Sequence, residues 1–202
     1  MDTMMTRSLL IVLCALLTGC AGGLSQYGGS DAGILVTSIA QDKDTRFDIY
    51  RLDYRSRDRR VSDSIAWMRS SALSSDAPDF SEPSKSGEVF ALKLAPGDYE
   101  IYNYAIMGKG VLFSAAEDFS VPFTIAAHES IYLGEFLALV TNGGNGPEKT
   151  IQSAPIFVIS NQRARDIALA QREEPRVAAL RDGIPSAASL RSPLFRKMPA
   201  GY

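Results

Sequence analysis

Short apolar stretches that alternate with polar residues recur along most of the chain, and turn-forming residues separate them. In residues 119–125, for example, Phe119, Val121, Phe123 and Ile125 alternate with polar or small residues, which is the period-two pattern of a strand with one buried face. A series of short strands at this spacing is typical of a sandwich or barrel. We therefore predict a mainly β protein, a single antiparallel β-sandwich, with strands at 34–39, 46–54, 61–68, 89–94, 99–106, 119–125, 131–140 and 151–159.

The best-defined part of this prediction is residues 88–106. Two strand patterns flank the sequence APGD at 95–98, in which proline and glycine hold the second and third positions. A type II turn favours this order, because proline presets φ and glycine accepts a positive φ. We expect the second strand to return beside the first, with Pro96, Gly97 and Tyr99 as the structural residues of the turn.

Two predicted strands depart from simple alternation. The apolar residues of 46–54 change face midway, which a bulge near Tyr50 would explain. On strand 131–140 we expect two opposed sets of side chains, Tyr132, Gly134 and Phe136 on one face and Ile131, Leu133 and Leu137 on the other.

The pattern becomes helical after the last strand. Ser160 or Asn161 is suited to cap a helix, and apolar or long side chains follow at helical spacing. The stripe consists of Ala164, Ile167, Ala168 and Gln171. We predict a helix over 161–182 that is kinked at Pro175, followed by a basic, disordered tail over 183–202.

Two other segments look unstructured. Residues 20–33 are rich in glycine and serine and predict a flexible tether. Residues 70–87 contain few large apolar side chains, so they predict a mobile surface loop. We interpret 34–160 as the single folded β domain between the tether and the helix.

The first residues carry a targeting signal. The apolar run 9–17 is too short to span a bilayer but fits a secretory signal peptide over residues 1–19, with Arg7 as its positive flank. Initiation at Met4 or Met5 would remove the unusual acidic Asp2.

The end of that run, Leu17-Thr18-Gly19-Cys20, resembles the lipobox of bacterial lipoproteins. This resemblance implies diacylglyceryl transfer to the Cys20 thiol, cleavage before Cys20 and acylation of the new amino terminus. Several acyl chains together anchor a protein stably. Ala21 favours delivery to the outer membrane, facing the periplasm. The alternative is an ordinary signal peptide with a chance cysteine.

Composition narrows the function further. The formal net charge of −2 gives no basic excess that would indicate a nucleic-acid partner. Cys14 leaves with the signal peptide and Cys20 is lipidated, so neither remains for a disulfide or a thiolate metal site. We expect packing alone to stabilise the domain, and we expect no cofactor.

Candidate catalytic residues are sparse, and we predict no enzyme. His128 is the one histidine, and its place in a turn predicts a solvent-facing side chain. Ser30 lies among glycines but lacks the strand and helix of a nucleophile elbow. The acidic residues Glu117, Asp118, Glu129 and Glu135 show no spacing that selects a pair, and we expect them to point to water.

Four arginines occur within residues 55–60. We interpret this run as a solvated hairpin tip whose charges Asp53, Asp58 and Asp63 balance. The alternative is a patch that binds anions or lipid headgroups.

Two resemblances concern the folded part. Residues 94–101, LAPGDYEI, resemble the L-x-P-G-x-Y-x-I turn of prealbumin-like (transthyretin-like) β-sandwich domains. Residues 119–136 are similar to the F-x-V-x-A-G-x-x-x-Y-L-G segment of uncharacterised bacterial lipoproteins on that fold, with His128 where the pattern often has glycine. The resemblance covers roughly residues 86–140. It implies a fold and supplies no catalytic residues.

The second resemblance lies in residues 159–167, ISNQRARDI, which are similar to a helix of outer-membrane-protein-A-like peptidoglycan-binding domains. It would give Arg163 a role in binding a cell-wall peptide carboxylate. The upstream aspartate-bearing segment of that family is missing, and we interpret the match as chance.

Together these observations predict a non-enzymatic envelope lipoprotein, anchored to the membrane through Cys20, whose sandwich is a protein-interaction or structural accessory module with an envelope protein partner. This hypothesis predicts an apolar surface patch near the C-terminal helix. The alternative is a small-ligand or glycan/peptidoglycan-binding lipoprotein, which predicts a concave aromatic pocket.

Overall fold

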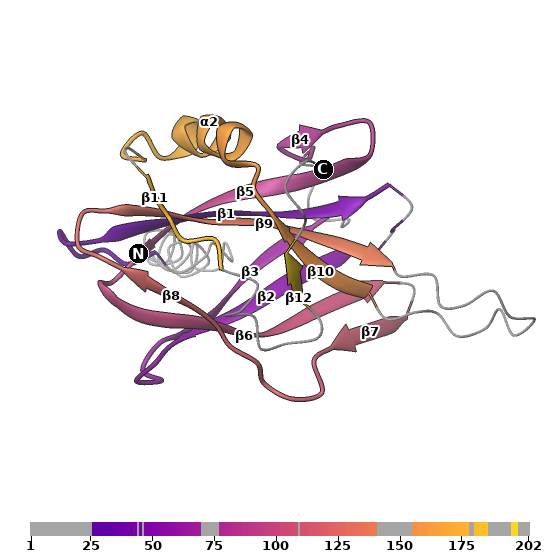
Figure 1. Cartoon of the computed structure of the whole chain (residues 1–202), viewed down its shortest axis with the longest axis horizontal. Coiled ribbons are helices and arrows are strands. Elements are labelled where there is room, and N and C mark those ends of the chain that lie inside the picture. The colour runs from indigo at the N-terminus through magenta and orange to yellow at the C-terminus, as the bar shows by residue number, and fades with distance from the viewer. Residues whose placement is uncertain are drawn as a thin grey trace, which may run out of the picture.

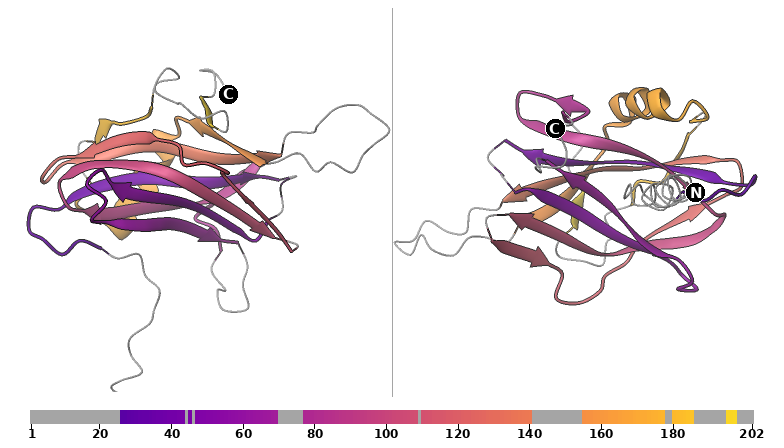
Figure 2. Two further views of the ribbon diagram at one scale, coloured as in Figure 1. Left: turned by 90° about the horizontal axis from the view of Figure 1, so that it is seen from below. Right: turned by 180° about the vertical axis from the view of Figure 1, so that it is seen from behind.

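The computed structural model describes residues 26–43, 45, 47–69, 77–108, 110–140, 155–177, 180–185 and 195–197. Two β-sheets, one mixed and one antiparallel, make up most of this part of the chain (Figures 1 and 2). The strands are β1 (Gly33–Asp42), β2 (Ile49–Ser56), β3 (Ser62–Met68), β4 (Phe80–Ser81), β5 (Lys85–Leu94), β6 (Gly97–Gly108), β7 (Val111–Ser114), β8 (Val121–Ile125), β9 (Ser130–Val140), β10 (Pro155–Ser160), β11 (Leu180–Asp182) and β12 (Phe195–Lys197). The described residues include one helix, α2 (Arg163–Glu173).

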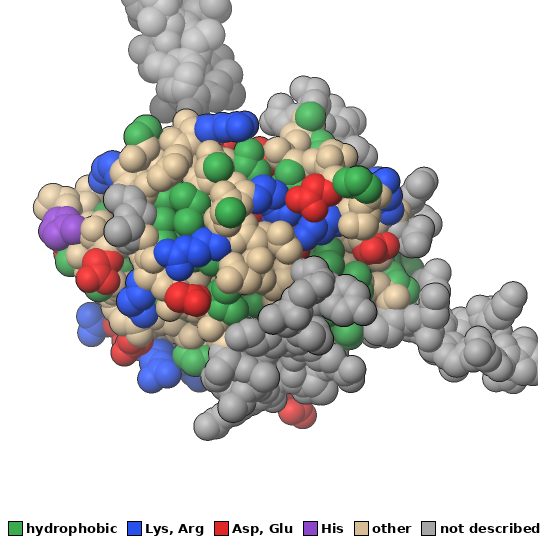
Figure 3. Space-filling view, turned by 45° about the horizontal axis from the view of Figure 1, so that its top comes forward, with side chains coloured by type: hydrophobic (Ala, Val, Ile, Leu, Met, Phe, Trp, Pro, Cys, Tyr) green, Lys and Arg blue, Asp and Glu red, His purple; other side chains and the backbone are tan. Residues whose placement is uncertain are grey.

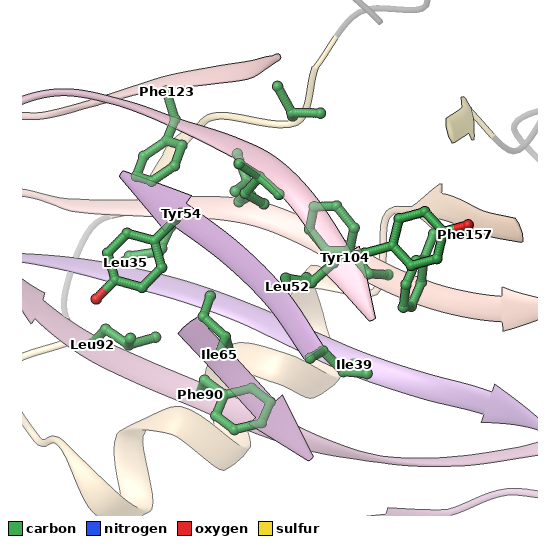
Figure 4. Close-up of a cluster of buried hydrophobic side chains, with 14 of the residues drawn as sticks. Leu35, Ile39, Leu52, Tyr54, Ile65, Phe90, Leu92, Tyr104, Phe123 and Phe157 are labelled. Atoms are coloured by element: carbon green, nitrogen blue, oxygen red, sulfur yellow. The ribbon is translucent and has the colours of Figure 1, made fainter. Parts of the chain in front are cut away.

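Strand order separates the two sheets cleanly. Sheet A runs β12-β10-β9-β1-β5-β4, and β11 also pairs with β9. Sheet B runs β3-β2-β6-β7, and β8 also pairs with β6. Their facing sides form one apolar core, in which Phe157 of sheet A meets the ring of Tyr104 of sheet B edge to face at 5.6 Å. Figure 4 shows part of this core.

The prediction of a wholly antiparallel sandwich is wrong for sheet A. There β1 pairs with β9 in parallel, as β11 does with β9 and β12 with β10. Between β1 and β9 the chain passes through both sheets, so no hairpin dictates their relative direction. Local alternation of apolar residues carries no information about such a distant pairing.

The predicted hairpin over 88–106 is instead a connection between the sheets. The strand before the turn, β5, belongs to sheet A, and the strand after it, β6, belongs to sheet B. Tyr99, which is 2% exposed, donates its hydroxyl hydrogen to the carbonyl oxygen of Ala95 at 2.9 Å and stacks on Phe123. Tyrosines whose hydroxyl forms a hydrogen bond with the backbone a few residues upstream also stabilise the corners of other β-sandwiches.

A bulge at Gly134 interrupts the pairing of β9 with β1. Val36 lies opposite Tyr132 and Ser38 lies opposite Glu135, so one residue of β1 faces two residues of β9. Gly134 has φ +104°, a conformation that side-chain-bearing residues rarely adopt. The extra residue turns every later side chain of β9 to the other face.

This bulge corrects the predicted faces of strand 131–140. Phe136 joins Ile131 and Leu133 in the core between the sheets, whereas Leu137 joins Tyr132 on the outer face of sheet A. The bulge expected on β2 near Tyr50 is also absent from that strand. The irregularity lies in its partner β6, where the register with β2 shifts after Asp53.

The helix ends earlier than predicted. The helix α2 stops at Glu173, before Pro175, because the residue preceding a proline is disfavoured in the helical region. Leu180–Asp182, predicted as helix, is strand β11. Strand β10 pairs with the second half of β9, α2 then crosses the outer face of sheet A, and β11 returns to pair with the first half of β9.

Three segments predicted as irregular contain ordered structure. In the predicted tether, the Tyr27 amide donates to the carbonyl oxygen of Lys93, and Lys93 in turn donates to the side chain of Gln26. In the predicted loop, Phe80 is buried on β4. In the predicted tail, 195–197 forms β12. The folded part therefore extends further toward both termini than predicted.

We expect Gly134→Ala to lower the free energy of unfolding by about 2 kcal/mol. The added Cβ would take up a disfavoured positive φ and would lie 2.9 Å from a methyl carbon of Ile159. The control is Gly28→Ala, where a Cβ meets nothing within 4 Å; it should stay within about 0.5 kcal/mol of wild type. Denaturant unfolding measures both, and equal stabilities would contradict this account of the bulge.

Candidate functional site

The most polar part of the interior lies between α2 and sheet A. Because the Gly134 bulge turns Glu135 to the outer face, this fully buried carboxylate points under the helix. It accepts hydrogen bonds from Lys85 at 2.7 and 2.9 Å, from Arg165 at 2.7 Å and from Ser160 at 2.9 Å. The three donor residues lie on different elements, so Glu135 joins β5, β10 and α2.

A second buried carboxylate, Asp166, lies on α2 itself. One of its oxygens accepts hydrogen bonds from the hydroxyls of Ser38 and Tyr132, each at 2.7 Å. The Tyr132 hydroxyl also accepts the backbone N–H of Gln162, at the start of the helix. The other Asp166 oxygen receives two hydrogen bonds from Arg165, at 2.6 and 2.8 Å.

Arg165 connects the two carboxylates. Its guanidinium contacts Asp166, Glu135 and, at 2.9 Å, Glu82, and it lies 3.5 Å above the ring centre of Phe80. A planar guanidinium with several fixed donors suits such a bridging position better than an ammonium. We call Glu135, Arg165 and Asp166 the buried ion triad.

The electrostatics of the triad follow from its burial. Burial raises the pKa of the Asp166 carboxyl, against the opposing effect of Arg165 and the two hydroxyl donors. Burial opposes the charge on Arg165, but the adjacent carboxylates outweigh it and raise the pKa of the guanidinium. The neighbouring Tyr132 also has a raised pKa, first because it is buried and then because Asp166 lies beside it.

Both triad carboxylates are fully buried, and their oxygens bind groups of the protein itself. This geometry suits a role in holding α2 against sheet A. The prediction that Glu135 points to water is therefore wrong. Of the predicted helical stripe, Ile167 packs toward sheet A, whereas Ala164, Ala168 and Gln171 are exposed. The buried residues of α2 are Asp166 and Ala170. Asp166 and Ala170 are four residues apart, which is the spacing of one helix face. The sequence pattern alone assigns an aspartate to the solvent side, so this face was not recognised as buried.

Arg163, the candidate cell-wall contact, lies at the first position of α2 and is partly buried. Its guanidinium donates to the carbonyl oxygen of Leu180, so it joins the helix to β11. Its binding role stays a prediction.

One end of the sandwich gathers several segments that are distant in sequence. Gln26 and Tyr27 line a hollow of about 180 Å³ together with Tyr54, Val61, Lys93, Leu94, Ala95 and Tyr99. A second hollow of about 400 Å³ adjoins it, lined by the turn before Tyr99 and by the β2–β3 tip. We call this the entry end, because the described chain enters the fold there. Pro96, Gly97 and Tyr99 thus shape this end as well as the turn.

The arginine run divides between two roles. Arg55 forms ion pairs with Glu100 at 2.8 Å and Asp118 at 2.9 Å and lies over the ring of Tyr102. The side chains of Arg57, Arg59 and Arg60 are exposed at the β2–β3 tip, where Arg60 pairs with Asp58 at 3.3 Å. The predicted balance is therefore confirmed for Arg60, which pairs with Asp58. It is wrong for Arg55, whose partners are Glu100 and Asp118, and Asp53 pairs with Arg51 instead.

The opposite end of sheet B presents apolar side chains outward. The register places four residues side by side across β3, β2, β6 and β7, namely Met68, Ile49, Met107 and Leu112. Directly paired residues share one face of a sheet. Met68 is 50% exposed and Leu112 is 59% exposed. We call these four residues the apolar row. It lies on sheet B, not beside α2 as predicted.

The α2 side has a different character. Figure 3, which turns that side toward the viewer, shows basic and acidic side chains interspersed with apolar ones. His128 is exposed in its turn, as predicted, and adopts φ +60° where the family pattern has glycine.

The lipobox residues Leu17, Thr18, Gly19 and Cys20 lie outside the described residues. Among the residues that the structure describes, no helix has the length and apolar content needed to cross a membrane. In the same part of the chain, no group of three or more His, Cys, Asp or Glu side chains is placed to hold a metal ion.

Comparisons with protein-family models, with curated proteins and with solved structures gave no match.

We expect Arg165→Met to lower the free energy of unfolding by about 3–5 kcal/mol, because it leaves two buried carboxylates without their shared cation. Methionine retains an apolar stem over Phe80, so packing changes little. Arg172→Met on the exposed side of α2 is the matched control and should change stability by less than about 0.5 kcal/mol. Chemical denaturation measures both; similar losses would contradict the assigned role of the triad.

The pH dependence of stability offers a second test. Hydrogen bonds from Arg176 and Lys93 lower the pKa of Glu174 from 4.5 to about 2. A carboxyl with a lowered pKa stabilises the fold above its unfolded pKa and loses that contribution as pH falls from 4.5 to 2. Glu174→Gln should therefore be less stable than wild type at pH 7, and the difference should shrink toward pH 2. A difference that does not change with pH would contradict this ion pair.

Proposed function

We propose that this chain is a non-enzymatic, membrane-anchored envelope lipoprotein whose β domain is a protein-interaction or structural accessory module. The anchor is the acylated Cys20, placed in the outer membrane facing the periplasm. The sequence Leu17-Thr18-Gly19-Cys20 supports the anchor. Among the described residues, contacts with the fold are already present at Gln26, six residues after Cys20, which suits a domain held close to a membrane.

The apolar row is the observation that carries the interaction role. Strand β2 runs from Ile49, in the row, to Ser56, beside the entry end. Seven steps at roughly 3.3 Å place the row about 23 Å from that end. A membrane-held domain would thus present the row away from the bilayer, where a protein partner has access. Exposed apolar side chains grouped on one face mark interaction sites.

A non-enzymatic role is supported by the chemistry of the described groups. Asp166, a buried carboxyl with a raised pKa, is enclosed by protein donors, and His128 lies on an exposed turn. Neither arrangement offers a substrate a positioned acid or base.

The finer fold assignment is also a proposal. The turn of residues 94–101, with Tyr99 bonded to Ala95, supports kinship with prealbumin-like sandwiches. The parallel pairing of β1 with β9 would then be a feature of this chain beyond that pattern.

The alternative of a small-ligand or glycan-binding module would use the hollows of the entry end. The tyrosine-lined hollow of about 180 Å³ is smaller than the roughly 300–1,000 Å³ of typical ligand pockets. Tyr54 and Tyr99 there are almost fully buried. The adjoining hollow of about 400 Å³ is large enough, but among the described residues Tyr99 is its one aromatic lining residue, so it is not the concave aromatic pocket that the alternative predicts. A peptidoglycan contact through Arg163 would have to replace its bond to Leu180. We therefore favour the interaction module.

A photoreactive amino acid placed in the apolar row tests this proposal. Incorporated in cells at Met68 or Leu112, it should yield one protein adduct of the same mass from both positions. The matched control is Val61, which is 39% exposed but lies at the entry end, and it should not yield that adduct. Leu112→Glu should reduce the Met68 adduct roughly tenfold, because a charge must then be desolvated in the contact.

Two outcomes would overturn the proposal. One is the absence of a protein adduct from both row positions in a well-folded protein. The other is an equal yield of the same adduct from Val61, which would show contact without regard to the row.

A further inference from the structure

The β2–β3 tip is a rigid, basic projection. Residues 57–60 are exposed between β2 and β3, and the backbone of Ser56 and Val61 closes the loop with a 2.9 Å hydrogen bond. Inside it, the Arg59 amide donates to the carbonyl oxygen of Ser56, and Arg59 adopts φ +59°. The Arg57 amide donates to Asp98 of the neighbouring turn, so the tip is fixed to the rest of the entry end.

The charges of this tip do not cancel. Asp58 accepts hydrogen bonds from Ser56 and from the Arg60 amide and pairs with the Arg60 side chain. Asp98 accepts a 2.7 Å hydrogen bond from Thr124. Within the described part of the chain, neither Arg57 nor Arg59 forms an ion pair. Two exposed guanidinium groups are thus available to an anion outside the protein.

The position of the tip suggests what that anion is. Val61, the last residue of the tip, lines the same hollow as Gln26 and Tyr27, where the described chain enters the fold. The six residues from Cys20 to Gln26 span at most about 20 Å when fully extended. If Cys20 is embedded in the bilayer, Gln26 lies within that distance of the headgroups, and the tip lies beside Gln26 at the same end of the domain.

We infer that Arg57 and Arg59 contact the phosphates of anionic phospholipids in the membrane that holds Cys20. Attraction of basic side chains to an anionic surface acts within a Debye length, roughly 8 Å at physiological salt, so the short tether is what makes the contact effective. The contact fixes the orientation of the domain and directs the apolar row away from the bilayer. This inference rests on the proposed membrane anchor.

The experiment uses the full-length acylated protein, purified in mild detergent and reconstituted into vesicles. The mature chain that follows Cys20 contains no other cysteine, so a fluorophore can be attached at one introduced thiol. Ser62→Cys places it beside the tip, and Leu112→Cys places it in the apolar row. Lipids with a nitroxide on the headgroup quench any fluorophore that approaches the membrane surface.

We expect strong quenching at residue 62 and weak quenching at residue 112 in vesicles that contain phosphatidylglycerol. In phosphatidylcholine alone, or at high salt, quenching at residue 62 should fall. Arg57→Gln combined with Arg59→Asn should lower the population in contact roughly tenfold. Asparagine at 59 suits the positive φ. Lys43→Gln with Arg172→Gln removes the same charge from exposed positions elsewhere and should have no effect.

The inference is overturned if quenching at residue 62 is the same in both lipids and in the double variant. The salt and lipid series leave Arg57 and Arg59 unchanged, so they test the inference even if the double variant folds poorly. A tip that binds an acidic protein instead would show quenching independent of lipid composition. Failure of the anchor is a separate result, because the mass of the purified protein shows whether Cys20 is acylated.

Discussion

Two carboxylates buried between a short helix and sheet A set the constraint on which the outer half of this structure depends. A buried charge without a partner is costly, so Glu135 and Asp166 require Arg165, and Arg165 requires α2 to lie across sheet A. The bulge at Gly134 turns Glu135 toward the helix, and the departure of β10 and return of β11 place the helix above it. The core between the two sheets requires only apolar side chains that pack well. The layer between α2 and sheet A requires one specific arrangement of charged groups.

The molecule is organised from one end to the other. At the entry end the chain joins the fold beside two fixed turns and a basic tip. At the other end of sheet B the apolar row is presented on the outer face. The helix and its ion triad lie on the outer face of sheet A, whereas the strands that join these two ends belong to sheet B. A domain anchored through Cys20 would therefore expose one surface to lipid and another to a partner.

The inner faces of the strands follow from sequence, because period-two alternation reports burial directly. Residues such as Val121, Phe123 and Ile125 were placed correctly on this basis. The parallel pairing of β1 with β9 could not be predicted, because it depends on how the chain returns through two sheets. The reversal of faces after Gly134 could not be predicted either. A glycine within a strand indicates a bulge only when the pairing with the neighbouring strand is known.

For the candidate sites too, local features could be predicted from the sequence and long-range ones could not. Tyr99 was identified from its local turn, and its hydroxyl bond is local too. The ion triad was missed because its members come from residues 135, 165 and 166, and each alone resembles a surface charge. The apolar row was missed because its residues lie on four strands and become neighbours only through the register.

The most direct test of the account is the intact mass of the protein isolated from cell membranes. The account predicts a mature chain that begins at Cys20 and carries a diacylglyceryl group on the thiol and an acyl chain on the amino terminus. An unmodified Cys20, or a chain cleaved elsewhere and recovered outside the membrane fraction, would contradict the anchor and with it the assignment of the two ends.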